Sequence, residues 1–165
     1  MNTASSPTLS PDHQRLQALV GAWHGEEEIS ATQWAPAGSA TAEVTAQAEF
    51  GGLFVMQRYR QARDGKTSFA SHNIFGVDQP NATCTMHQFD TMGFVPAEPA
   101  TGTWGDTGLA LVKSSPRGAA RTTYRFDTPD SYRMRLEFKA AGSDIWQDMV
   151  NGVYRRVSPS SITLS

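Results

Sequence analysis

Residues 39–62 read SATAEVTAQAEFGGLFVMQRYRQA, two runs of residues separated by Gly51 and Gly52. In the first run, small or apolar side chains occupy every second position, with threonine, glutamate or glutamine between them. This alternation is typical of a strand with one buried and one solvated face, and the glycine pair predicts a tight hairpin. The predicted buried face of the first strand consists of Ala42, Val44, Ala46, Ala48 and Phe50.

Similar short runs fill most of the remaining chain, and Gly, Asp, Asn and Pro interrupt them at close intervals. They predict an all-β fold, an antiparallel up-and-down barrel of about ten strands, because a sheet of this size tends to close and so loses its exposed edges. The predicted strands are 22–30, 39–50, 53–62, 67–77, 82–91, 99–104, 108–114, 119–126, 132–140 and 145–157.

One short helix is predicted before the first strand. Ser10 can cap it, Pro11 suits its first turn and Gly21 follows as a stop signal. We expect a single domain over residues 10–157, with loose termini at 1–9 and 158–165.

Composition and charge exclude several classes of function. The formal net charge is −2 over 165 residues, so no nucleic-acid partner is expected. No apolar run reaches the roughly 18 residues of a membrane helix, and residues 1–11 lack the parts of a signal peptide. We therefore expect a cytoplasmic protein without membrane contact. Cys84 is the only cysteine, which excludes an internal disulfide, and no spacing of histidines and carboxylates predicts a metal site.

Hairpin geometry predicts which side chains meet inside the barrel. The glycine hairpin carries Gln57 and Tyr59 to the buried face, because tight turns fix the register of the strands they join. If the next two hairpins are equally regular, His72 lies opposite Gln57 and His87 lies opposite His72. Polar groups converging in an apolar interior are the usual mark of a binding site. The sequence therefore predicts an inward cluster of Gln57, Tyr59, His72 and His87.

The C-terminal strands predict an apolar wall opposite this cluster. Residues 132–140 alternate regularly between aromatic or aliphatic side chains and charged ones. The inward side chains predicted for this wall include Tyr124, Met134, Leu136 and Trp146, with Asp148 as its one acid. The same register leaves an apolar patch on the outer face, which the N-terminal helix or a second copy of the chain would cover. This patch contains Phe54, Met56, Phe75 and Met86.

The opening Gly21-Ala22-Trp23 resembles the Gly-x-Trp start of the calycin superfamily, the lipocalin and fatty-acid-binding-protein barrels. This resemblance implies that an arginine of the last strand, Arg155 or Arg156, packs on Trp23 and closes the barrel. The chain is more closely similar to a bacterial family of calycin-like domains of unknown function. The matching stretches are 21–25, 51–52, 76–78, 90–92 and 146–156.

The resemblance implies a fold without a settled activity. A related branch, nitrobindin, binds haem through a histidine late in the chain, whereas this sequence has no histidine after His87. No cofactor is therefore expected, and haem binding through His72 or His87 is disfavoured.

Three functions are compatible with these residues. The first is binding of a small, largely apolar molecule in the barrel, with the His/Gln/Tyr cluster at its polar end. The second is a cofactor-free lyase, isomerase or cyclase in which His72 or His87 is the general base and the other histidine, or Tyr59, is the acid. The third is a module that forms homodimers through the outer apolar patch. The residues leave the choice between binding and catalysis open.

Overall fold

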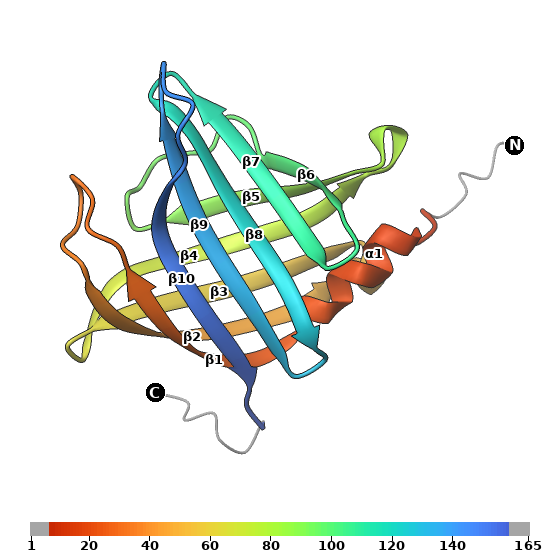
Figure 1. Ribbon diagram of the computed structural model, residues 1–165. Helices are drawn as coiled ribbons and strands as arrows, with labels where there is room; N and C mark the ends of the chain where they lie inside the picture. Colours follow the sequence, from red (N-terminus) through yellow and green to blue (C-terminus); the bar gives the residue numbers. More distant parts are fainter. Residues whose placement is uncertain (1–6, 159–165) are drawn as a thin grey trace, which may run out of the picture.

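The structure is a computed structural model that describes residues 7–158 (Figure 1). Its ten strands form one closed antiparallel barrel in which neighbours in sequence are neighbours in space and β1 pairs with β10. The predicted up-and-down barrel is confirmed, with every strand end within two residues of its predicted position. The predicted loose termini fall largely outside the described residues. The strands are β1 Gly21–Ile29, β2 Gly38–Glu49, β3 Phe54–Arg63, β4 Lys66–Asp78, β5 Thr83–Asp90, β6 Ala100–Trp104, β7 Gly108–Ser115, β8 Gly118–Thr128, β9 Ser131–Ala140 and β10 Gln147–Arg156.

The predicted helix is α1, Pro11–Leu16, which continues into a 3₁₀ turn, η1, over Gln17–Leu19. It starts with a reciprocal cap: the Ser10 hydroxyl accepts from the backbone N–H of His13, and the Ser10 N–H donates to Nδ1 of His13 at 2.9 Å. Leu16 and Leu19 are 1% exposed and belong to the core. The segment α1–η1 therefore closes one end of the barrel. Among residues 7–158, no helix has the length and apolar character needed to cross a bilayer.

Trp23 is the main aromatic side chain at this closed end. Its indole N–H donates to the carbonyl of Leu19 at 3.0 Å, and its ring packs edge-to-face with the ring of Tyr132, with the ring centroids 4.8 Å apart. The Arg156 guanidinium lies 4.2 Å from the ring centroid and donates to the carbonyl of Val20 at 2.7 Å. Of the two arginines predicted to contact Trp23, Arg156 makes the contact, while Arg155 is exposed on the outer face.

The β2–β3 register follows the predicted hairpin, with Ala46 opposite Gln57 and Val44 opposite Tyr59. The next turn also has the predicted two residues, Asp64 and Gly65, both with positive φ as in a type I′ turn. Beyond this turn, the pairing of β3 with β4 is shifted by one residue from the predicted register.

The shift comes from a β-bulge at Ser68. Ala62 pairs with Thr67 but Gln61 pairs with Phe69, so Ser68 is the extra residue of β4. The Ser68 hydroxyl donates to the side-chain Oε1 of Gln61 at 2.9 Å, which holds the bulge against β3. Because side chains alternate between faces, one extra residue exchanges the inner and outer faces of β4, and β5 follows it.

A second bulge occurs in β10. Asp148 pairs with Glu137 and Val150 pairs with Leu136, so Met149 is the extra residue. Beyond the bulge, Val150, Gly152 and Tyr154 face inward. The inward position predicted for Asp148 is wrong, because Asp148 lies on the outer face with Glu137.

The bulge at Ser68 removes part of the predicted outer apolar patch. Phe75 and Met86 are 0% and 5% exposed and belong to the core, so their predicted outward position is wrong. Cys84 also faces inward, and its burial raises the pKa of its thiol to about 11. Of the four predicted patch residues, Phe54 and Met56 lie on the outer face, where Met56 pairs with Ile74.

Candidate functional site

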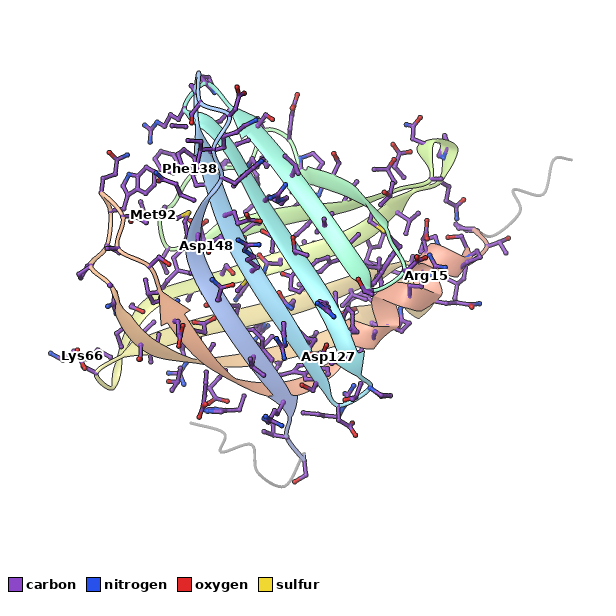
Figure 2. All side chains as sticks on the ribbon, viewed as in Figure 1. Arg15, Lys66, Met92, Asp127, Phe138 and Asp148 are labelled. Atoms are coloured by element: carbon purple, nitrogen blue, oxygen red, sulfur yellow. The ribbon has the colours of Figure 1, made fainter. Side chains whose placement is uncertain are left out.

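The barrel interior differs between its two ends. Near α1 the inward side chains are fully buried, as Trp23 and Tyr132 are at 1% exposure. Toward the opposite end, the inward residues of β9, Met134, Leu136 and Phe138, are only half-buried. Figure 2 shows Phe138 at the end of the barrel away from Arg15 of α1. The inward side chains of β9 that lie far from α1 are therefore more accessible to solvent than those near α1.

A buried carboxylate, Glu27 of β1, is the centre of the polar part of the interior. It is 2% exposed, and the Tyr59 hydroxyl lies 2.6 and 2.8 Å from its two oxygens. The amide of Gln61 donates to Oε1 at 2.9 Å, and the Tyr154 hydroxyl donates to Oε2. Glu27, Tyr59, Gln61 and Tyr154 form what we call the Glu27 cluster.

Local sequence explains the shape of this cluster. The Ser68 hydroxyl at the bulge donates to Oε1 of Gln61, which turns the amide nitrogen of Gln61 toward Glu27. The Tyr154 ring lies against Gly25 and Gly152, where any Cβ atom would overlap it. Stacking on Tyr132, with ring centroids 4.8 Å apart, fixes the ring from its other side.

Glu27 was missed by the sequence reasoning because it stands in a run of three glutamates, Glu26 to Glu28, that resembles a solvated segment. The available signal was alternation from Trp23, which places Glu27 on the same face as Trp23 and Gly25.

Within the described part of the chain, the Glu27 carboxylate has no positively charged partner. None of the ion pairs among residues 7–158 includes it. Two phenols and one amide supply its hydrogen bonds, as burial of a carboxylate requires. Burial, followed by the charge of Glu27, raises the pKa of Tyr59 and of Tyr154 far above the ordinary value. Both hydroxyls therefore stay protonated at neutral pH.

Alkaline titration should report this environment directly. The chain has four tyrosines, and burial raises the pKa of each above the ordinary 10.0. A pKa that is higher in the folded state gives stability that is complete below pH 10 and is lost as the pH rises further. We expect no tyrosinate absorbance at 295 nm near pH 10, and its appearance only together with loss of the β-sheet circular dichroism. One tyrosine ionising near pH 10 in the intact fold would contradict this assignment.

Gln57 and Asn73 form a second buried polar pair on β3 and β4. The amide nitrogen of Asn73 donates to Oε1 of Gln57 at 2.8 Å, and the two residues are 4% and 3% exposed. The other amide atom, Oδ1 of Asn73, is buried without a hydrogen-bond partner. Buried acceptors are rarely left unpaired, so this atom marks a position where a donor fits.

Comparison with known proteins agrees with this architecture. A family called DUF1579, described as a protein of unknown function, matches residues 8–156. The chain belongs to this family. It is similar to the crystal structure of Rv2717c from M. tuberculosis, at 24% identity and a TM-score of 0.70 over 92% of this chain and 100% of that one. It is also similar to an S-type phycobiliprotein lyase, CPES, from Guillardia theta, at 12% identity and a TM-score of 0.61 over 92% and 99%. No curated protein matches the chain significantly.

These matches bear out the predicted resemblance to calycin-like domains of unknown function. At these sequence identities, the two structural neighbours show the fold of this DUF1579 chain but not its function.

The inward position predicted for the two histidines is wrong. His72 is exposed beside Arg58 and Phe89 on the outer face, and the half-buried His87 pairs with Ile74 on that same face. The physical cause is the bulge at Ser68, which turns Ser71, Asn73 and Phe75 inward instead. The histidines therefore contact neither Gln57 nor Tyr59 and cannot act as acid, base or haem ligand inside the barrel. Among the residues described, no three His, Cys, Asp or Glu side chains are grouped to hold a metal ion.

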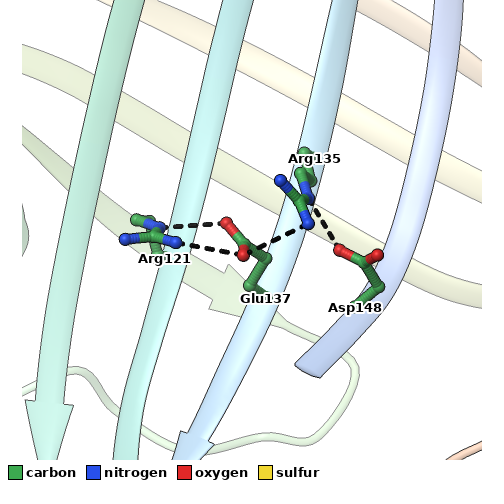
Figure 3. Close-up of polar contacts among 4 residues, drawn as sticks. All are labelled: Arg121, Arg135, Glu137 and Asp148. Atoms are coloured by element: carbon green, nitrogen blue, oxygen red, sulfur yellow. Dashed lines mark hydrogen bonds and ion pairs between the residues drawn. The ribbon is translucent and has the colours of Figure 1, made fainter. Parts of the chain in front are cut away.

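The inward position predicted for Trp146 is also wrong. Its ring packs outside the barrel, 4.3 Å from the Arg121 guanidinium and 5.2 Å from the Lys139 ammonium. Below it, Arg121 binds both oxygens of Glu137, and Arg135 bridges Glu137 and Asp148 (Figure 3). The bulge at Met149 accounts for this outer position.

The buried position predicted for Ala48 and Phe50 is wrong: both are exposed, Phe50 to 77%, because β2 ends at Glu49 and Phe50 begins the 3₁₀ turn η2, Phe50–Gly52.

The remaining predicted inward residues lie where they were expected. Tyr124, Met134 and Leu136 line the wall formed by β8 and β9, and Gln57 and Tyr59 face inward from β3. Two open surface hollows beside α1, with volumes of about 490 and 580 Å³, contain none of these residues or of the Glu27 cluster.

Proposed function

We propose that this protein binds a small, largely apolar molecule inside the barrel, with the polar end of the molecule toward the Glu27 cluster. The observation that carries this proposal is the division of the interior into a polar and an apolar side. Glu27 and Asn73 lie on β1 and β4, whereas the half-buried Met134 and Leu136 lie on β9. Ligand pockets are typically apolar with a few convergent polar groups.

The apolar wall supplies most of the expected affinity. Each Å² of apolar ligand surface removed from water contributes roughly 25 cal/mol, so about 200 Å² contributes about 5 kcal/mol before the cost of association. The hydrogen-bonding groups then orient the ligand, because a bound molecule that leaves them unpaired loses affinity.

The experiment begins with freshly purified protein. Its native mass spectrum and its ultraviolet–visible absorption identify any molecule that is retained. Fluorescence titration with Nile red, a neutral apolar probe, then measures access to the interior. Leu136→Glu, which places a charge on the apolar wall, is expected to weaken Nile red binding at least tenfold, since burying an unpaired charge is costly.

The matched control changes the outer face. His72→Phe combined with His87→Phe should leave Nile red affinity within twofold, because both side chains lie outside the barrel. Unchanged binding in a folded Leu136→Glu variant, or lost binding in the histidine variant, would refute an interior site.

A cofactor-free lyase or isomerase is the second candidate, and the contact between Tyr59 and Glu27 favours it. A carboxylate can take a proton from a bound molecule, and a neighbouring protonated phenol can donate a hydrogen bond to the negative charge that develops. These two residues replace the histidines of the sequence-based hypothesis. Turnover by this route would disappear in Glu27→Gln and persist in the histidine variant.

A further inference from the structure

We infer that the ligand of this barrel carries a positively charged nitrogen with N–H donors, such as a protonated amine or amidine, on an apolar body. This inference deepens the proposed function and rests on it. The reason is an imbalance of charge and of hydrogen-bond donors inside the barrel.

The first observation is the charge of Glu27. Its neighbours, Tyr59, Gln61 and Tyr154, are all neutral donors. Hydrogen bonds from neutral groups solvate a carboxylate but leave its net charge in place. Lys113, whose register places it on the inner face of β7, is half-buried toward the end far from α1. It forms no ion pair with Glu27. A charge in a poorly hydrated interior acts over longer distances than one at the surface, so a cation that enters is attracted and an anion is repelled.

The second observation is independent of Glu27. Oδ1 of Asn73 is buried and has no donor, although Asn73 itself is 4% exposed and bonded to Gln57 through its nitrogen. The unsatisfied group beside Gln57 is thus an acceptor, as the carboxylate is. The other buried atom without a partner among the described residues, Nε1 of Trp104, is a donor, and it lies at the α1 end of the barrel. A ligand rich in N–H donors fits both acceptors, whereas a fatty-acid carboxylate fits neither.

Three naphthalene probes of nearly equal size test the inference at pH 7: 1-naphthylmethylammonium, 1-naphthalenemethanol and 1-naphthylacetate. Their affinities for the full chain are measured by isothermal titration calorimetry. We expect the ammonium to bind at least tenfold more tightly than the alcohol, and the acetate to bind most weakly. In Glu27→Gln the ammonium should lose its advantage and bind within twofold of the alcohol.

Glu26→Gln is the matched control, because Glu26 is exposed on the same strand. This substitution should leave the order of the three probe affinities unchanged. If Glu27→Gln does not fold, Tyr59→Phe keeps the carboxylate and removes one of its donors, so the preference for the ammonium should increase. Equal binding of the ammonium and the alcohol by the wild-type chain would overturn this inference and leave the proposed function standing. No binding of any of the three probes, with no binding of Nile red, would overturn both.

Discussion

Replacing Trp23 by alanine is expected to lower the free energy of unfolding by about 4 kcal/mol, as is usual when a large buried aromatic side chain is truncated. Trp23 is 1% exposed and packs against Tyr132, Arg156 and the η1 turn. The substitution leaves a cavity under α1 and removes the ring on which the Arg156 guanidinium lies. For a domain of this size, the melting temperature should fall by about 8–16 °C.

Urea denaturation followed by circular dichroism measures this effect, and Trp34→Ala is the control. Trp34 is 56% exposed. Among the described aromatic rings, it packs against that of Phe138. Its loss should cost about 1 kcal/mol or less, since exposed side chains contribute little. Equal costs for the two tryptophans would mean that Trp23 does not anchor the closed end.

Replacing Glu27 by alanine is expected to cost about 3 kcal/mol, although it removes a buried charge. The substitution leaves the hydroxyls of Tyr59 and Tyr154 and the amide of Gln61 without their acceptor. Each buried donor without a partner costs about 1–3 kcal/mol, and partial rearrangement makes the sum less than additive. The same denaturation measurement applies.

Two further variants isolate the cause. Glu27→Gln retains one side-chain acceptor and should cost about 1 kcal/mol. Glu26→Ala, at an exposed position of the same strand, should change stability by less than about 0.5 kcal/mol. If Glu27→Ala were as stable as the wild type, the cluster would make no contribution to folding and would have to be explained by ligand binding alone.

The sequence predicted those parts of the fold in which short turns join regular strands. Val44 and Tyr59 pair as expected because Gly51 adopts the positive φ that the β2–β3 turn requires. Tyr124 meets Met134 because the β8–β9 turn keeps the alternation of its two strands in phase. In both cases local turn chemistry was sufficient to place side chains that are distant in sequence.

The interior could not be predicted where a single residue breaks the alternation. Ser68 and Met149 are ordinary strand residues, and nothing in their identity marks a bulge. The hydrogen bond from Ser68 to Gln61 that accompanies the first bulge depends on the folded sheet, not on neighbours in sequence. Both histidines and Trp146 were therefore assigned to the wrong face, although their strands were correctly predicted.

The extra residue at Ser68 also has a consequence for how such barrels diverge. Deleting one residue there would restore the simple register and turn Ala70, His72 and Ile74 into the barrel interior in place of Ser71, Asn73 and Phe75. One codon thus separates an interior of amide and hydroxyl groups from one that contains imidazole. Relatives whose β3–β4 hairpin differs in length by one residue should therefore differ in the chemistry of their barrel interior, even where their backbones superimpose.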